Sequence, residues 1–209
     1  MRKTNYPTKH NYKVAHDFCL SLMPLVYSNN NILIFGGQII FYQEQNFQGD
    51  YYECSSDCPE LSSHLSRCSS VRVKNGAWVL FERPNYLGRQ YVLTRGEYPD
   101  YHHWKGNTPS VRSCHIIPYF SGTFRIRIFE KPDFSGQMLE CIQDINQLSD
   151  VWSPGGVHSA QVQDGAWIFY ELPDYNGQQY LLERGQYRRF GEWAAMEPTV
   201  GSLRRVCDI

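Results

Sequence analysis

Residues 81–98 read FERPNYLGRQYVLTRGEY, and residues 170–187 read YELPDYNGQQYLLERGQY. The two stretches align at a separation of 89 residues, which also relates Trp78 to Trp167. A constant separation that includes tryptophans indicates an internal duplication. The chain therefore contains two similar halves.

A shorter phrase occurs twice in each half: an aromatic residue, four residues, a second aromatic, one residue and a glycine. Its four copies are Tyr42/Phe47/Gly49, Phe81/Tyr86/Gly88, Phe129/Phe134/Gly136 and Tyr170/Tyr175/Gly177. A hairpin that folds back over its own sheet needs glycine where the backbone takes a positive φ or passes close to another strand. The two rings supply a large apolar area to cover the fold. We therefore predict four folded hairpins.

Alternating residues predict strands. Ile126 and Ile128 alternate with Arg125 and Arg127, a period of two that is typical of a half-buried antiparallel strand. Turn-forming residues recur at short intervals along the chain, and helical patterns are limited to a turn or two. The sequence predicts an all-β fold.

Length and charge limit the function. A chain of 209 residues with 42% hydrophobic residues divides naturally into two domains of somewhat under ~100 residues. A net charge of −1 gives no basic surface for nucleic acid. The apolar runs at 18–27 and 32–35 are too short to span a membrane. We expect neither nucleic acid nor a membrane as a partner.

Residues 1–36 lie outside the repeats. Arg2 and Lys3 precede an apolar run, as in a signal peptide, but Asp17 lies at the edge of that run and Pro24 interrupts it. We expect a poorly ordered arm.

The cysteines are odd in number and unevenly divided between the halves. This distribution favours reduced thiols in a cytosolic protein over a disulfide framework. Cys54, Cys58 and Cys68 form a cluster in sequence that we expect to be prone to oxidation.

These features resemble a vertebrate γ-type βγ-crystallin, either γS-like or of the fish type. The resemblance covers Gly37 to Ile209 and extends to the runs YECSSDCPEL (52–61), FEKPDFSGQM (129–138) and SLRRV (202–206). It implies two β-sandwich domains, each of two Greek-key motifs. The implied divisions are an extension at 1–36, an N-terminal domain at 37–117, a linker at 118–122 and a C-terminal domain at 123–209.

The resemblance also assigns structural roles. It implies a serine that locks each folded hairpin. By position these serines lie 21, 22, 23 and 25 residues after the four glycines, and each opens a similar run: SVRV, SVRS, SAQV and SLRR. Tyr98 and Tyr187 match the tyrosine-corner position. Trp152 lies outside the 89-residue pairing and is expected to be more exposed than the paired tryptophans. The implied serines and paired tryptophans are Ser70, Ser110, Ser159, Ser202, Trp78, Trp104, Trp167 and Trp193.

In the family the two domains pair through a small apolar patch. Carried over by local motif, the patch consists of Val79, Val92 and Ile117 facing Ile168, Leu181 and Val206. A short linker gives the domains a high effective concentration for each other. We therefore expect intramolecular pairing and a monomer, with weak short-range contacts to other crystallins.

Calcium binding is the main alternative function, in a calcium- or partner-binding module outside the lens. Many βγ modules bind calcium through an acidic or amide pair followed two residues later by Ser/Thr-Ser. The corresponding hexapeptides lack the pair: LSRCSS (65–70), KGNTPS (105–110), PGGVHS (154–159) and EPTVGS (197–202). We expect no metal and no cofactor.

Zinc binding and catalysis have little support in the sequence. Cys54, Cys58, Cys68 and His64 have zinc-ligand chemistry but not a paired-knuckle spacing. No nucleophile elbow or phosphate loop occurs in the sequence. We expect no catalytic residues and no enzyme, and a long-lived structural protein in the cytoplasm of lens fibre cells that gives a high refractive index and transparency.

Overall fold

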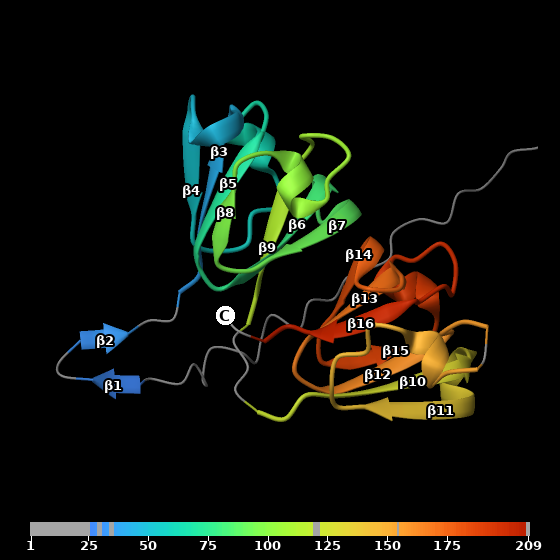
Figure 1. Ribbon diagram of the computed structural model, residues 1–209. Helices are drawn as coiled ribbons and strands as arrows, with labels where there is room; N and C mark the ends of the chain where they lie inside the picture. Colours follow the sequence, from blue (N-terminus) through green and yellow to red (C-terminus); the bar gives the residue numbers. More distant parts are fainter. Residues whose placement is uncertain (1–25, 29–30, 34–35, 119–121, 154, 208–209) are drawn as a thin grey trace, which may run out of the picture. The chain divides into compact units, whose positions relative to one another are not determined.

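The computed structural model describes residues 26–28, 31–33, 36–118, 122–153 and 155–207 (Figure 1). Residues 1–34 form a unit of their own, in which β1 (Val26–Ser28) pairs with β2 (Asn31–Leu33) in antiparallel register. Most of the expected arm, Cys19 and the centre of the expected linker (119–121) lie outside the described residues. The second unit, residues 35–209, contains both halves of the duplication.

The N-terminal half begins with an antiparallel sheet in the order β4-β3-β5-β8. Its strands are β3 (Gln38–Tyr42), β4 (Tyr51–Cys54), β5 (Ser70–Asn75) and β8 (Gly96–Tyr98). Along β5, Val71 and Val73 are buried whereas Arg72 and Lys74 are not, because alternate side chains point to opposite faces of the sheet.

The C-terminal half repeats this sheet in the order β11-β10-β12-β15. Its strands are β10 (Arg125–Lys131), β11 (Ser135–Cys141), β12 (Ser159–Asp164) and β15 (Gly185–Tyr187). Ile126 and Ile128 are fully buried between exposed or half-buried arginines. The predicted alternation on this strand is confirmed.

A third sheet contains strands from both halves, in the order β16-β13-β14-β7-β6-β9. Its strands are β6 (Ala77–Arg83), β7 (Leu87–Leu93), β9 (Ser113–Ile117), β13 (Trp167–Leu172), β14 (Asn176–Leu182) and β16 (Ser202–Arg205). β7 and β14 meet where Gln90 is opposite Gln179. This position is the junction between the halves.

The motifs within each half exchange strands. β8 belongs to the second motif in sequence but pairs with β5 of the first, and Cys58 of the first motif bridges to Cys114 on β9. In the C-terminal half β15 pairs with β12, and Ile145 bridges to Leu203. This exchange joins two Greek-key motifs into one β-sandwich domain.

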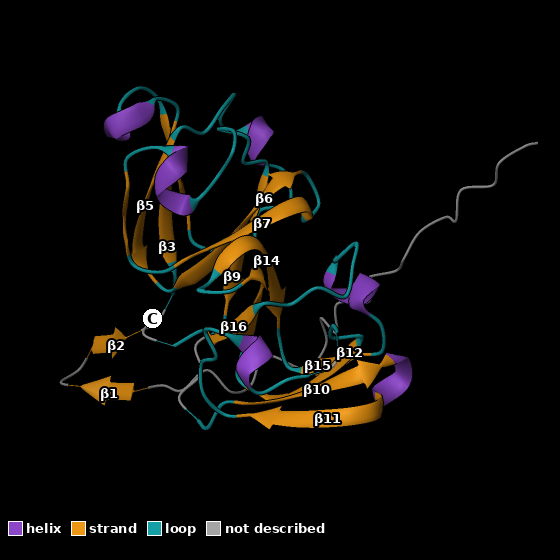
Figure 2. Ribbon diagram, turned by 45° about the vertical axis from the view of Figure 1, so that its right-hand side comes forward, coloured by secondary structure: helices purple, strands orange, loops and turns teal. Residues whose placement is uncertain are grey.

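Strands dominate the described chain, as Figure 2 shows in orange. The helical segments are short 3-10 turns at Gln45–Phe47, Leu61–Ser63, Tyr101–Trp104, Pro132–Phe134, Leu148–Asp150 and Phe190–Trp193. Within the described ranges, no helix has the length and apolar character needed to cross a membrane. The all-β prediction is confirmed.

Each domain has its own apolar core. Trp78, Phe41 and Leu80 lie in the N-terminal core, and Trp167 and Phe169 lie in the C-terminal one.

Trp152 is the most exposed of the five tryptophans, as expected, but the difference is small, because the four paired tryptophans are 0–3% exposed. Its side chain is 7% exposed, and its indole Nε1 donates to the carbonyl of Gly156 at 3.0 Å. The turn at Leu148–Asp150 precedes it, and the amide of Trp152 itself donates to the carbonyl of Leu148. The tryptophan outside the 89-residue pairing is therefore slightly more exposed than the paired ones, but it still lies in a core.

Candidate functional site

The four aromatic phrases form four hairpins of the same geometry. In each, the residue before the second aromatic, that aromatic and the glycine all have a positive φ, for example Asp174 (56°), Tyr175 (59°) and Gly177 (81°). The two rings of each phrase lie 5.6–5.7 Å apart between centroids and are steeply inclined to each other. Such edge-on contacts are favourable for aromatic pairs.

The glycines of the other three phrases adopt nearly the same backbone conformation as Gly177. Their φ angles are 78° at Gly49, 85° at Gly88 and 78° at Gly136. Each also lies close to a side chain that precedes its hairpin, since a Cβ there would lie 2.9 Å from Glu44 Cγ, 3.3 Å from Arg83 Cγ and 2.8 Å from Glu130 Oε2, respectively. These positions therefore have both a positive φ and little space for a Cβ, the two conditions that favour glycine.

In each hairpin a buried serine hydroxyl bonds two backbone groups, the amide of the second aromatic residue and the carbonyl three residues before it. Ser70 Oγ accepts from the amide of Phe47 at 2.9 Å and donates to the carbonyl of Glu44 at 2.6 Å. Ser159 makes the same two bonds, to Phe134 and Lys131. Ser202 makes them to Tyr175 and Leu172.

In the second hairpin the hydroxyl is that of Ser113, which corrects the prediction of Ser110. Ser113 Oγ accepts from the amide of Tyr86 at 3.0 Å and donates to the carbonyl of Arg83 at 2.7 Å. Ser110 is only half-buried and donates to the carbonyl of Glu82. The sequence carried the correct signal, because Ser113 precedes Ser202 by the 89-residue repeat, whereas the spacing of 22 residues from Gly88 pointed to Ser110.

We expect Ser113→Ala to lower the free energy of unfolding of the N-terminal domain by about 1–3 kcal/mol, because an amide and a carbonyl lose their buried partner. Ser110→Ala removes one half-exposed bond and is expected to cost well under ~1 kcal/mol. Urea unfolding of the full chain measures both. Equal losses for the two variants would contradict the assignment to Ser113.

Both predicted tyrosine corners have hydroxyl bonds to the backbone four residues upstream. Tyr98 Oη donates to the carbonyl of Thr94 at 2.9 Å. Tyr187 Oη donates to the carbonyl of Glu183 at 3.1 Å and accepts from its amide at 3.0 Å. The Tyr98 bond links β8 to the residues that follow β7, and the Tyr187 bond links β15 to the residues that follow β14.

The four paired tryptophans are all buried, in two types of environment. Trp78 Nε1 and Trp167 Nε1 donate to the carbonyls of Asn75 and Asp164 in the preceding turn. Among the described residues, the indole nitrogens of Trp104 and Trp193 have no hydrogen-bond partner.

The apolar patch between the domains is larger than the sequence suggested. Five of the six predicted residues lie in one apolar cluster: Val92, Ile117, Ile168, Leu181 and Val206. The same cluster also contains Ala77, Ala166, Tyr170 and Tyr175. Val79 is fully buried and pairs with Val92 across β6 and β7.

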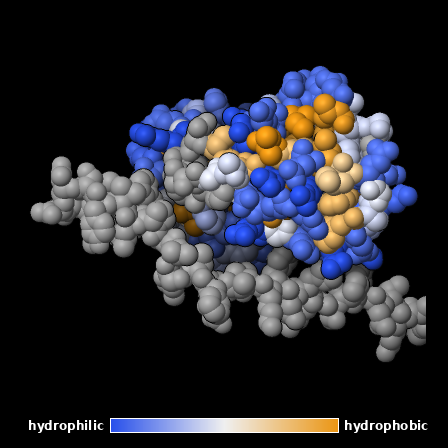
Figure 3. Space-filling view, turned by 90° about the horizontal axis from the view of Figure 1, so that it is seen from below, coloured by the Kyte–Doolittle hydropathy of each residue, from blue (hydrophilic) through white to orange (hydrophobic). Residues whose placement is uncertain are grey.

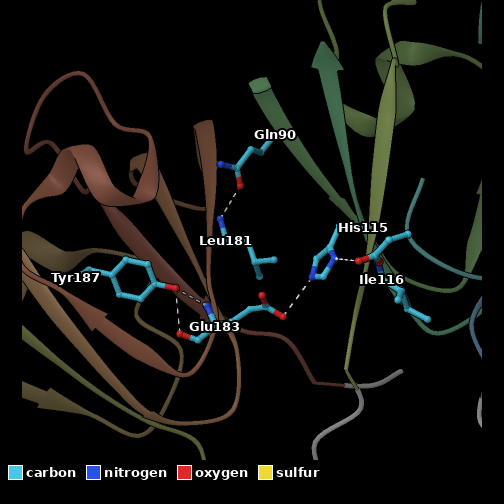
Figure 4. A network of polar contacts seen from close by, with 7 residues as sticks. Gln90, His115, Ile116, Leu181, Glu183 and Tyr187 are labelled. Carbon is cyan, nitrogen blue, oxygen red and sulfur yellow. Dashed lines mark hydrogen bonds and ion pairs between the residues drawn. The ribbon is translucent and has the colours of Figure 1, made fainter. Parts of the chain in front are cut away.

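Two glutamines frame this patch with reciprocal bonds. Gln90 Oε1 accepts from the amide of Leu181 at 2.9 Å (Figure 4). Gln179 Oε1 accepts from the amide of Val92, also at 2.9 Å. Gln90 and Gln179 are themselves related by the 89-residue repeat. No motif in the sequence singled them out, although the repeat offset marks them as equivalent.

A histidine crosses the same interface. His115 Nδ1 lies 2.9 Å from Asp57 Oδ2 of its own domain, and His115 Nε2 lies 3.3 Å from Glu183 Oε1 of the other. Cys114 points into the core, so the two neighbours lie on opposite faces of β9.

The described cysteines are free thiols. Cys54 Sγ and Cys114 Sγ lie 4.0 Å apart in the N-terminal core, whereas complete burial raises the pKa of Cys68 to about 12. His64 stacks on Tyr52 at 4.0 Å between ring centroids. In the part of the chain that the structure describes, no group of three His, Cys, Asp or Glu residues could hold a metal ion.

Known proteins share this organisation. Residues 38–117 and 125–206 match the Beta/Gamma crystallin family. Gamma-crystallin M2 of Chiloscyllium indicum is 54% identical over 172 residues, which are 82% of this chain and 98% of the relative. Gamma-crystallin B of Bos taurus is 55% identical over the same length and the same shares. A solved structure of a beta gamma crystallin from Ciona intestinalis is 30% identical, covers 38% of this chain and 99% of that one, and has a TM-score of 0.37.

The chain therefore belongs to the βγ-crystallin family, with two crystallin domains at 38–117 and 125–206. Its γ-crystallin relatives match it over nearly their whole length. It is a structural crystallin of the lens and not an enzyme.

Proposed function

We propose that this chain acts as a monomer in the cytoplasm of lens fibre cells, where its two domains pair within one molecule. The observation that carries the proposal is the shared apolar patch, which is covered by the chain's own second domain. A patch covered in this way is not available for association with a second copy.

The proposal includes the domain divisions and the structural roles of individual residues. The divisions are 37–117, 118–122 and 123–209. The hairpin serines and the tyrosine corners hold the folded hairpins and crossovers in place, and glycines allow each hairpin to fold at Gly49, Gly88, Gly136 and Gly177.

Composition supports the optical role. Aromatic residues make up 15% of the chain, and 14 of the 20 basic residues are arginine. Rings and guanidinium groups are highly polarisable, so they raise the refractive index per unit mass. The refractive index of a concentrated protein solution rises with this increment per unit mass.

Solubility at high concentration then depends on short-range surface chemistry. With a net charge of −1 there is little long-range repulsion, and salt screens the remainder within about 8–10 Å. On the face shown in Figure 3, hydrophilic residues surround a smaller hydrophobic area. The large exposed apolar side chains in the described chain are Tyr51, Tyr86, Leu87, Met138, Ile142, Val151, Leu172 and Met196.

Val92→Asp tests the pairing. The substitution removes the apolar contacts of Val92 and places a carboxylate in the patch, where it loses its hydration. We therefore expect the free energy of domain pairing to weaken by roughly 2 kcal/mol. Small-angle scattering should show a larger radius of gyration, and the urea midpoint should fall.

Val151→Asp is the matched control, because Val151 is 57% exposed. It is expected to leave both measurements unchanged. The monomer is tested by sedimentation of the unmodified chain at increasing concentration. An unchanged radius of gyration in Val92→Asp, or a stable dimer of the unmodified chain, would refute the proposal.

A further inference from the structure

The imidazole of His115 lies between carboxylates from two different domains (Figure 4). A neutral imidazole has one N–H, and an ionised carboxylate only accepts hydrogen bonds. Both contacts can therefore be hydrogen bonds at the same time only when the ring is protonated. The position of the ring between two carboxylates therefore favours the cationic form of His115.

Both acidic residues are anchored within their own domain, Asp57 through its carboxylate and Glu183 through its backbone. Asp57 Oδ1 accepts from the amide of Ile116 at 2.9 Å, which places Asp57 beside β9. The amide and carbonyl of Glu183 are bonded to the hydroxyl of Tyr187. The ring of His115 therefore connects two fixed positions, one in each domain.

The internal repeat provides a comparison for this arrangement. The residue 89 positions after His115 is Arg204, which lies 3.7 Å from Asp144 and 5.7 Å from the centre of the Tyr175 ring. His115 has the corresponding neighbours in Asp57 and Tyr86, the latter at 6.3 Å between ring centroids.

The two copies differ in two respects. The C-terminal copy has a guanidinium, which is permanently charged, where the N-terminal copy has an imidazole that titrates near neutral pH. Thr94, 89 positions before Glu183, carries no charge, so the carboxylate from the opposite domain has no counterpart in the other copy. The titratable link between domains is thus specific to one side of the interface.

We propose that His115, Asp57 and Glu183 form a proton-dependent clasp, in which the protonated ring links the two domains and loss of its proton weakens their pairing. This clasp rests on the domain pairing proposed above. The groups facing the ring are Asp57 from the segment after β4, Tyr86 from the β6–β7 hairpin, Glu183 from the end of β14, and the uncharged Val79 on β6.

The direction of the pH effect follows from the same contacts. Burial lowers the pKa of His115, but hydrogen bonds to Asp57 and Glu183 and their charges outweigh it and raise the pKa from 6.5 to about 9. A folded-state pKa above the unfolded value gives a contribution that is complete below pH 6.5 and is lost as the pH rises through about 9. Domain pairing should therefore weaken on the alkaline side.

The amides of Val92 and Leu181 report on pairing in the full chain, because they donate across the interface. We expect their hydrogen-exchange protection factors, corrected for the intrinsic rate, to fall roughly two- to fivefold between pH 6.5 and 9.5. The ring of His115 should titrate by NMR well above 6.5. In Glu183→Gln the midpoint of the His115 titration should fall by roughly 0.3–0.7 pH units. The protection factors of the Val92 and Leu181 amides at pH 6.5 should fall roughly two- to fivefold.

Variants at His115 separate charge from titration. His115→Arg introduces the cation found at position 204 and should keep high protection across the pH range. His115→Gln should give low protection that does not change with pH. Glu197→Gln makes the same chemical change as Glu183→Gln on an exposed carboxylate of the same domain, and should match the unmodified chain.

Failure of the clasp can be distinguished from failure of pairing. If Glu183→Gln leaves the His115 midpoint unchanged, or if the unmodified chain shows no loss of protection with pH, the clasp is refuted. If Val92→Asp leaves the protection of the Leu181 amide unchanged, the pairing itself is wrong. Loss of protection in Val92→Asp without any effect of the His115 and Glu183 variants would reject the clasp alone.

Discussion

Trp167→Ala is expected to lower the free energy of unfolding of the C-terminal domain by about 3–5 kcal/mol. Trp167 is completely buried in the core of that domain, and the edge of Phe124 packs against it at 6.3 Å between ring centroids. Truncation removes a large apolar area and leaves a cavity that strands on both sheets cannot close. It also leaves the carbonyl of Asp164 without the indole donor.

Urea unfolding of the full chain would show this loss as an early transition of the C-terminal domain. Trp78→Ala should give an early transition of the N-terminal domain, because Trp78 is equally buried and bonds to Asn75 in the same way. A loss below ~1 kcal/mol in both variants would show that these indoles do not organise the cores.

Phenylalanine substitutions separate packing from hydrogen bonding. Trp167→Phe loses volume and the bond to Asp164, whereas Trp193→Phe loses volume alone, since its indole nitrogen has no partner among the described residues. We expect the Trp167 variant to be the less stable of the two by about 1 kcal/mol. The reverse order would contradict this account of the indole contacts.

Gly177→Val is expected to lower the free energy of unfolding of the C-terminal domain by roughly 2–5 kcal/mol. Gly177 has a φ of 81°, which is costly for any residue with a Cβ and more so for a β-branched one. A Cβ there would also lie 3.1 Å from Glu171 Cβ and from Leu172 Cγ. The valine would therefore open the hairpin that carries Tyr175.

Gly191→Val is the matched control, because a Cβ at Gly191 meets nothing within 4 Å and the residue is exposed. Its cost should stay within about 1 kcal/mol. Thermal unfolding followed by near-ultraviolet circular dichroism measures both variants. Similar midpoints for the two would show that the hairpin does not depend on this glycine.

Repeats made much of this molecule predictable. The 89-residue offset relates Trp78 to Trp167, Gln90 to Gln179 and Ser113 to Ser202. Duplicated sequences fold in the same way, so equivalent positions have equivalent environments. Ser110 corresponds at that offset to Thr199, whereas Ser113 corresponds to the hairpin serine Ser202, so the repeat itself favours Ser113.

Positions outside the repeat were harder to interpret. Trp152 has no partner at the offset, yet a short turn buries it against Gly156. Its burial depends on the path of the loop between β11 and β12, for which the sequence carries no periodic signal.

Sequence alone determined the all-β class, the double duplication and the residues with a fixed backbone requirement. Such requirements are local, because a glycine at positive φ or a strand with alternating burial is defined by its immediate neighbours. Only the tertiary structure brought His115 to Asp57 and Glu183, which lie 58 and 68 residues away along the chain. Contacts of that kind depend on how the strand exchange and the β7–β14 junction place separate segments, and no local pattern encodes that placement.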